Sequence, residues 1–293
     1  MRRWSSIAKA TALEILSEPL SLLLLLAALV MATLAPAFHY HQFGEATRMA
    51  RDAGFSALFL GGVLTAVFGT VRTFRREIET GTAQMALAHP VSRTAFFLSK
   101  VAGAFAATAV FCAVVALTTL TVVNGAAIGG ELASRNGDVA RLWGPSFAIG
   151  MGTMLLPLVL AAALNHFARF RFVLTFFALA LATASAGAVY RFDLELALRL
   201  APVAAAAVLP VAAFLSRSAA AAVKFRANGA VATAGLVLAA SVPVVGNYYL
   251  PDALSKGGEL PWGYVGLAAA ALLPAVVAFL LAGVQMFKGR DVS

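Results

Sequence analysis

The chain has 293 residues, of which 61% are hydrophobic and only 12% are charged, and its mean hydropathy is +0.88. This is far more apolar surface than a soluble domain can bury, so the composition excludes a soluble enzyme or binding protein. The formal net charge is +9, but no arm or tail of the chain carries a dense run of basic residues. We therefore interpret the positive charge as a determinant of membrane topology and of attraction to anionic lipids, and not as a sign of nucleic-acid binding.

The first 18 residues form a polar to amphipathic segment ahead of the first apolar stretch. Residues such as Trp4, Lys9 and Glu14 suit a helix that lies along the cytoplasmic membrane interface and stops at Pro19. An ordinary charged flank is the alternative interpretation. No small-residue cleavage site precedes a soluble region, so we do not expect a cleaved signal peptide.

Eight stretches are apolar and long enough to cross the roughly 30 Å of membrane hydrocarbon, which takes about 20 helical residues. They run from 19 to 38, 53 to 71, 96 to 122, 146 to 165, 172 to 190, 200 to 216, 229 to 247 and 262 to 286. The loops between them leave no room for a soluble catalytic or nucleotide-binding domain. The sequence therefore predicts an all-α polytopic membrane protein with 1–293 as a single transmembrane domain.

Lysine and arginine residues set the expected orientation, because cytoplasmic flanks retain positive charge. With the N-terminus inside, fifteen of the 22 Lys and Arg residues lie on the cytoplasmic side and seven on the outer side. Both termini are therefore expected in the cytoplasm, with the chain as a multi-pass protein of the inner (cytoplasmic) membrane.

The sixth and seventh stretches are the weakest of the eight. The sixth contains Pro202 and Pro210, and the seventh is rich in Ala, Val and Gly, so both could instead be re-entrant helices between six full spans. That arrangement would reduce the charge bias to 12 against 10, and we therefore favour eight spans.

A polar interruption separates the second and third spans and contains a cytoplasmic segment, 72–95. Thr80 can cap a short helix over 81–88. Pro90 ends that helix, because the residue before proline is pushed out of the α region. Ser92 can then cap the third span. Two interpretations of this segment remain open. It is either a short helix that docks into a cleft of a partner or a plain polar loop.

Several sequence motifs carry a family resemblance. REIETGT is followed by HPVSR and then by SK at the start of the next span. Toward the C-terminus, SRSAAAAVKFR, LPDALSKGGELPWGY, a final apolar span and MFKGRDV follow in order. In order and spacing these motifs resemble type-2 ABC transporter permeases, especially the branch related to copper-enzyme maturation permeases.

The resemblance implies a permease subunit that exports an unidentified substrate, forms a homodimer or pairs with another permease, and binds a separate ABC ATPase. No G-x-x-x-x-G-K-[ST] string occurs in the chain, which fits a transport subunit that is not itself an enzyme. ATP and Mg would sit on the ATPase partner, and no cofactor or metal is expected in this chain.

The resemblance also implies that residues 77–93 form a coupling helix that contacts the ATPase. Its entry would be shaped by Glu77, Glu79 and Gly81, its contact face by Met85 and Leu87, and its rigid return by Pro90, Ser92 and Arg93.

Two other functional classes remain open at this point. An ion-coupled secondary transporter usually carries ionisable residues inside its spans, whereas here Asp, Glu, Lys and Arg fall in loops or at span ends. A membrane anchor or relay for an ATPase, which itself carries no substrate, is compatible with the same sequence.

Overall fold

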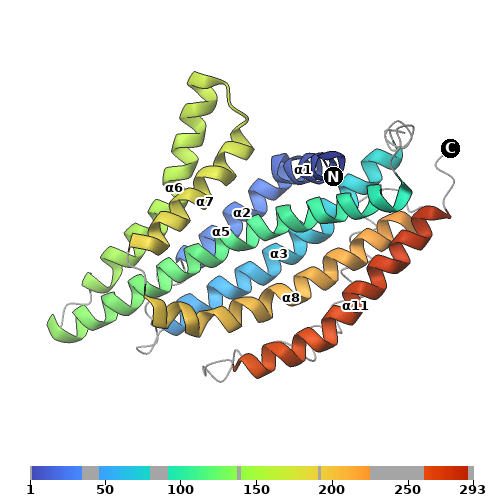
Figure 1. Cartoon of the computed structure of the whole chain (residues 1–293). Helices are drawn as coiled ribbons and strands as arrows, with labels where there is room; N and C mark the ends of the chain where they lie inside the picture. The colour runs from blue at the N-terminus through green and yellow to red at the C-terminus, as the bar shows by residue number, and fades with distance from the viewer. Residues whose placement is uncertain are drawn as a thin grey trace.

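The computed structural model describes residues 2–34, 46–79, 92–136, 140–190, 193–224 and 261–289. Within these ranges all regular structure is helical, which confirms the expected fold class. The helices are α1 (Arg2–Ser17), α2 (Pro19–Leu34), α3 (Ala46–Glu79), α5 (Arg93–Asn136), α6 (Ala140–Ala168), α7 (Phe172–Tyr190), α8 (Leu194–Lys224) and α11 (Trp262–Lys288). Figure 1 shows an elongated bundle in which α6 and α7 lean away from the other helices.

Six of the described helices are long and apolar enough to cross a membrane: α3, α5, α6, α7, α8 and α11. They contain six of the expected spans, and α2 contains the described part of the first. The described part of α2 passes the same test only together with α1, from which it is bent by 64°. The expected span 229–247 lies outside the described residues.

The helices that flank the polar interruption are longer than the sequence predicted. The second span was expected to end at residue 71 and the third to begin at 96, but α3 stays helical to Glu79 and α5 begins at Arg93. The 44 residues of α5 amount to about 66 Å, twice the hydrocarbon thickness. Hydropathy marks only the stretch that suits lipid, whereas helical hydrogen bonds continue wherever side chains still pack on a neighbour. Residues 72–79 are therefore the last turns of α3.

The sixth apolar stretch lies within one continuous helix. α8 runs for 31 residues through both Pro202 and Pro210. The re-entrant alternative is therefore wrong for this stretch. In Figure 1 the end of α8 and the start of α11 lie at opposite ends of the bundle, and the two helices pack along each other.

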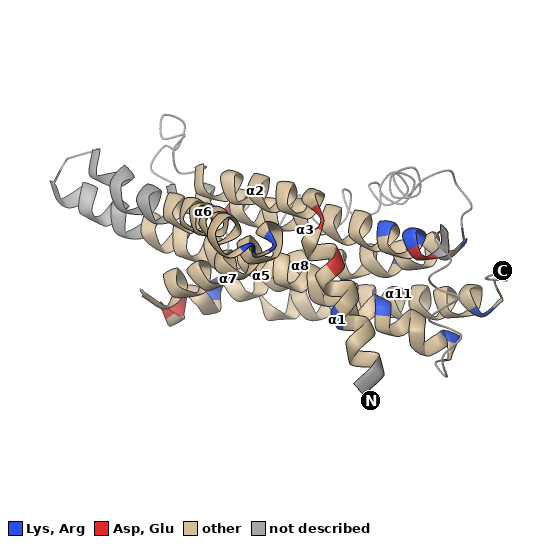
Figure 2. Ribbon diagram, turned by 90° about the horizontal axis from the view of Figure 1, so that it is seen from above, with Lys and Arg blue, Asp and Glu red and all other residues tan. Residues whose placement is uncertain are grey.

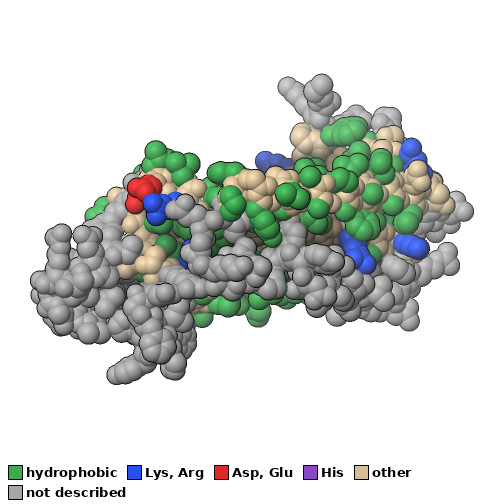
Figure 3. All heavy atoms as spheres, turned by 90° about the horizontal axis from the view of Figure 1, so that it is seen from below, with side chains coloured by type: hydrophobic (Ala, Val, Ile, Leu, Met, Phe, Trp, Pro, Cys, Tyr) green, Lys and Arg blue, Asp and Glu red, His purple; other side chains and the backbone are tan. Residues whose placement is uncertain are grey.

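Close helix approach builds the centre of the bundle, where α3 packs against both α5 and α8. A β-carbon at Gly61 of α3 would lie 2.7 Å from the Phe111 ring of α5, and one at Gly62 would lie 3.1 Å from the Cys112 sulfur. Small residues permit this approach, as in membrane helix pairs generally. On the face drawn in Figure 3, hydrophobic side chains cover much of the described surface between charged groups.

Candidate functional site

Four helix segments meet at one end of the bundle: α1, the last turns of α3, the first turns of α5 and the last turns of α11. α1 packs on α5, α2 and α3, and α11 packs on α5 and α8. Figure 2 shows many of the described Lys and Arg residues gathered toward this end. We call it the basic end. It holds the two helix ends, at Glu79 and Arg93, that border the part of the expected coupling segment outside the described residues.

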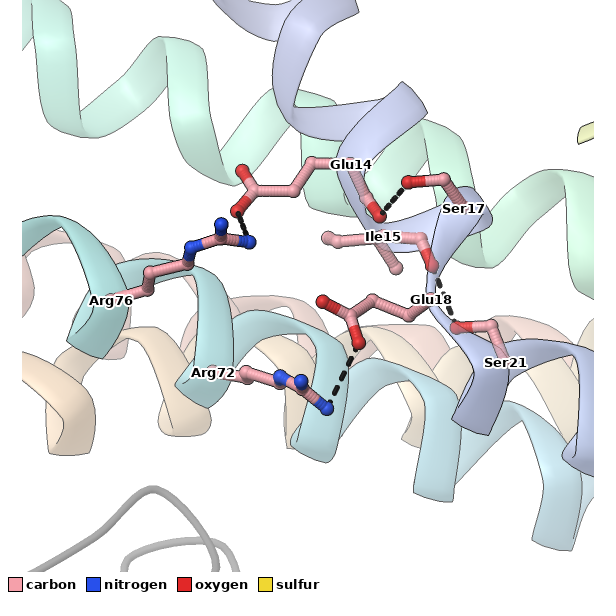
Figure 4. Close-up of polar contacts among 7 residues, drawn as sticks. All are labelled: Glu14, Ile15, Ser17, Glu18, Ser21, Arg72 and Arg76. Carbon is pink, nitrogen blue, oxygen red and sulfur yellow. Dashed lines mark hydrogen bonds and ion pairs between the residues drawn. The ribbon is translucent and has the colours of Figure 1, made fainter. Parts of the chain in front are cut away.

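Two glutamates tie α1 and its junction with α2 to the last turns of α3 (Figure 4). Arg72 Nη1 lies 2.9 Å from Glu18 Oε2, and Arg76 Nη1 lies 3.7 Å from Glu14 Oε1. The Ser21 hydroxyl donates a 2.7 Å hydrogen bond to the carbonyl oxygen of Ile15 across the 64° bend. The bend is therefore held from both sides, by ion pairs to α3 and by this hydrogen bond.

Glu14 lies in a half-buried position on α1. Burial raises the pKa of the Glu14 carboxyl above its ordinary value, and the positive charge of Lys100 partly opposes that rise. Glu77 raises the same pKa further, so Glu14, Glu77 and Lys100 belong to one electrostatic cluster. This cluster links α1, α3 and α5.

Lys100 is the most deeply buried charged side chain at the basic end of the described structure, with 1% of its surface exposed. Its ammonium nitrogen lies 2.7 Å from Glu77 Oε1, and the Glu77 side chain is 26% exposed. The same nitrogen lies over the rings of Phe74 and Phe96, at 5.6 and 5.9 Å from their centroids. An ammonium group buried this deeply requires such a partner, because an unpaired charge in the interior is strongly unfavourable.

A cluster of phenylalanine rings connects α3, α5 and α11 beside this ion pair. Phe74 and Phe97 lie 5.4 Å apart between ring centroids, and Phe287 of α11 lies 5.9 Å from Phe96 and 6.0 Å from Phe97. Gly283 lets α11 approach, because a β-carbon there would lie 2.5 Å from the Phe97 ring. Ring pairs at these separations pack favourably.

The start of α5 is fixed by two polar contacts. Ser92 Oγ accepts a 3.2 Å hydrogen bond from the Ala95 backbone N–H, which confirms Ser92 as the expected cap. Arg93 Nη1 donates a 3.0 Å hydrogen bond to the Lys288 carbonyl oxygen in the last turn of α11. The start of α5 is thus attached to the end of α11.

The expected coupling residues are only partly within the described structure. Glu77, Ser92 and Arg93 all lie at the basic end, and Glu79 is the last described residue of α3. Gly81, Met85, Leu87 and Pro90 lie outside the described residues, as does the expected helix 81–88.

Sequence reasoning missed the partners of these residues. It used Lys100 only in the count of cytoplasmic charges and in the SK motif, and it assigned no role to the acidic residues of α1 beyond an interfacial face. Charge spacing carried no signal for pairs such as Lys100 with Glu77, since the two residues belong to different helices.

A shallow cavity opens where α2 meets α3, lined in part by Thr65, Phe68, Glu18 and Arg72. Its volume is about 10 Å³, room for about one water molecule, which is far below the roughly 300 to 1,000 Å³ of ordinary small-molecule sites. We therefore do not assign it to the transported substrate. The described part of the chain also brings together no group of three or more His, Cys, Asp or Glu side chains able to hold a metal ion.

Comparison with known proteins identifies the class of this bundle. The family model described as ABC-2 family transporter protein matches residues 12–185, which is more than half of the chain. No curated protein and no solved structure matches the chain. The matched region begins in α1, continues through the helix ends at Glu79 and Arg93, and reaches into α7. The chain therefore belongs to the ABC-2 transporter family of multi-pass membrane proteins, whose members are transport subunits that associate with an ABC ATPase.

Proposed function

We propose that this chain is the membrane-spanning permease subunit of an ABC exporter in the inner membrane, powered by a separate ATPase that holds ATP and Mg. In this proposal the basic end faces the cytoplasm and receives the ATPase. The observation that carries it is the convergence of α1, α3, α5 and α11 around the two helix ends at Glu79 and Arg93.

The charge distribution supports this orientation. Arg72, Arg76, Lys100 and Lys288 all lie at the basic end, and cytoplasmic flanks of membrane helices are the flanks enriched in Lys and Arg. α1, which contains the first described residues, and the end of α11 also lie there, in keeping with two cytoplasmic termini.

The packing supports a role in mechanical coupling. A helix end that only faced solvent would need no buried ion pair and no aromatic cluster behind it. Here the ends of α3 and α5 are joined to each other by Glu77 and Lys100 and to α11 by Phe287. Force applied by an ATPase between residues 79 and 93 would therefore reach three helices of the bundle.

The ATPase contact itself is assigned to the coupling segment. Met85 and Leu87 would face the ATPase, with Glu79 and Gly81 shaping the entry to this contact. Pro90, Ser92 and Arg93 would fix the return into α5. Glu77 belongs to the same segment, but its side chain points back to Lys100, so we assign it to the base of the contact. Two copies of the chain, or this chain with a second permease, would complete the transport path.

Affinity purification of the full chain from its own membranes tests this proposal. The expected result is a co-purifying protein with a G-x-x-x-x-G-K-[ST] motif and ATP hydrolysis by the complex. Replacing Met85 with Glu or Gly81 with Trp should reduce the recovered ATPase, because either change alters the proposed contact face.

Glu195→Gln is the matched control, since Glu195 forms an exposed ion pair with Arg199 at the start of α8, away from the basic end. Equal ATPase recovery with all four proteins would contradict the assignment of the coupling segment. Absence of any ATPase from the wild-type preparation would contradict the proposed function itself.

A further inference from the structure

The Glu77 and Lys100 pair joins two positions at the base of the coupling segment. Glu77 lies within the last turn of the described α3, and Lys100 lies about two turns into α5. Their 2.7 Å contact therefore joins the two points at which the chain leaves α3 and enters α5. The last turn of α3 and the first turns of α5 are held together at this point.

Stability alone does not account for an ion pair between the buried Lys100 and the partly exposed Glu77. Replacing such a pair with apolar side chains of similar volume is often neutral or stabilising, because removing two charges from water opposes their attraction. Lys100 is almost fully buried and is surrounded by Phe74, Phe96 and the Glu77 carboxylate. What the pair adds over an apolar contact is a fixed relative position of two helices.

The same lysine contacts the side chains that connect α5 to α11. Phe96 lies under the Lys100 ammonium on one side and stacks on Phe287 of α11 at 5.9 Å, with 18° between the ring planes. Phe74, the second ring beside Lys100, contacts Phe97, which also contacts Phe287. A shift of the pair would therefore displace the rings on which the last turn of α11 rests.

We propose that Glu77 and Lys100 are positioning residues that make the end of α3 and the start of α5 move as one body, and thereby transmit ATPase movement to α11. This inference rests on the proposed function, because it requires an ATPase that acts between these two helix ends. Neither residue needs to touch ATP or the transported substrate. The pair sets how far a movement at residues 79 and 93 is passed on to Phe287.

Hydrogen exchange of the purified permease and ATPase complex, with and without ATP, tests the inference. In the wild-type complex we expect ATP to change the amide exchange of the last turns of α11, from Gly283 to Lys288. Lys100→Met and Glu77→Gln should reduce that ATP-dependent change by at least about fivefold, the lower end of ordinary coupling factors. Binding of the ATPase should persist in Lys100→Met, because Lys100 is buried behind the proposed contact and is not part of it.

Two double variants separate a positioning role from simple loss of folding. Glu77→Gln with Lys100→Met leaves no lone buried charge, so it should fold like the wild type and still lose the ATP-dependent change in α11. Glu77→Lys with Lys100→Glu restores opposite charges and should recover at least about half of the change. If the pair only stabilised the fold, the folded double variant Glu77→Gln with Lys100→Met, called the neutral double variant, would show the same ATP-dependent change in α11 as the wild type.

The outcomes distinguish the inference from the proposed function. An ATP-dependent change in α11 that is as large in the neutral double variant as in the wild type would overturn the positioning role and leave the proposed function standing. A wild-type preparation without an ATPase would overturn the proposed function and the positioning role with it. Glu195→Gln is the control and should leave the ATP-dependent change unaltered, since its exposed pair lies away from the basic end.

Discussion

Glu18 and Arg72 join the bend between α1 and α2 to the third helix, with 2.9 Å between Glu18 Oε2 and Arg72 Nη1. Glu18 is only 14% exposed, whereas Arg72 is 54% exposed, so the carboxylate is held in place and the arginine reaches in from the surface. The pair attaches a segment at the start of the chain to the last turns of α3.

Breaking this pair should loosen the bend. Glu18→Gln and Arg72→Gln are each expected to lower the free energy of unfolding in detergent, with a coupling energy of about 1 kcal/mol in a double-mutant cycle. Unfolding of the two single variants and the double variant in a denaturant series measures it. Additive effects of the two changes would contradict a direct interaction.

Close contact between α1 and α5 should make Gly103 intolerant of a larger side chain. A β-carbon at Gly103 would collide with the Ala8 carbonyl oxygen and would lie 2.7 Å from Thr11 Cβ. We expect Gly103→Leu to destabilise the protein by about 1 to 3 kcal/mol and to expose α1 to limited proteolysis.

Gly152→Leu in α6 is the control for this change, because nothing lies within 4 Å of a β-carbon at that position. The interpretation fails if both leucine variants show the same proteolysis pattern and the same unfolding midpoint.

The aromatic contact of α11 should be important for stability. Phe287 is 1% exposed and contacts both Phe96 and Phe97. Phe287→Ala is expected to lower the free energy of unfolding by about 3 kcal/mol, because it removes a ring from a packed site. The matched variant Phe167→Ala should have little effect, since Phe167 is 84% exposed at the end of α6. Thermal unfolding in detergent measures both, and a larger effect of Phe167→Ala would refute the packing argument.

Glu14 should make stability depend on pH. Its pKa is raised above 4.5 in the folded protein, chiefly by burial, so folding favours the neutral carboxyl. The stabilisation that the neutral Glu14 carboxyl gives the folded protein is fully present below the pKa of Glu14 in the unfolded chain. It is lost as the pH rises through the pKa of Glu14 in the folded protein. Glu14→Gln should therefore be at least as stable as the wild type near pH 8, and its relative advantage should shrink as the pH falls toward about 4.5.

Thermal unfolding of the two proteins across this pH range provides the measurement. A glutamine variant that is less stable than the wild type at high pH would mean that the 3.7 Å pair with Arg76 outweighs the burial of the carboxylate.

The proposed orientation predicts the side from which cysteines are labelled. In a Cys112→Ala background, Lys9→Cys and Lys224→Cys should react with a membrane-impermeant maleimide only from the cytoplasmic side, because they lie on the side of the basic end. Glu195→Cys should react only from the other side. Labelling of intact cells and of inverted vesicles measures the two sides. Labelling of Lys9→Cys and Glu195→Cys from the same side would refute the orientation.

The apolar stretches were the part of the fold that could be read from the sequence. Runs of about 20 apolar residues must be helical in a bilayer, because hydrocarbon offers the backbone no other hydrogen-bond partner. Six of the eight expected spans accordingly lie within described helices, including 200–216 despite Pro202 and Pro210, and α2 contains the described part of the first. Helix ends were less accurate: α5 continues to Asn136, well beyond residue 122, because backbone hydrogen bonds can continue a helix where the sequence is no longer apolar, and hydropathy does not register them.

At the candidate site, the sequence by itself determined local features and the family likeness. Ser92 could be identified as a cap because a serine oxygen reaches an N–H within its own first turn. The motifs around the polar interruption indicated the ABC-2 family before any contact was known, and the family match agrees with them.

Only the tertiary structure decided which side chains meet across helices. Lys100 and Glu77 are 2.7 Å apart because α3 and α5 pack side by side, and Phe287, from the other end of the chain, packs on the neighbouring Phe96 ring. Hydropathy and charge counts are sums along the chain, whereas these contacts depend on helix rotation and register, which close packing fixes. The sequence thus specified a membrane permease with a polar turn between two spans, and the packing of four helix ends placed a buried ion pair beneath that turn.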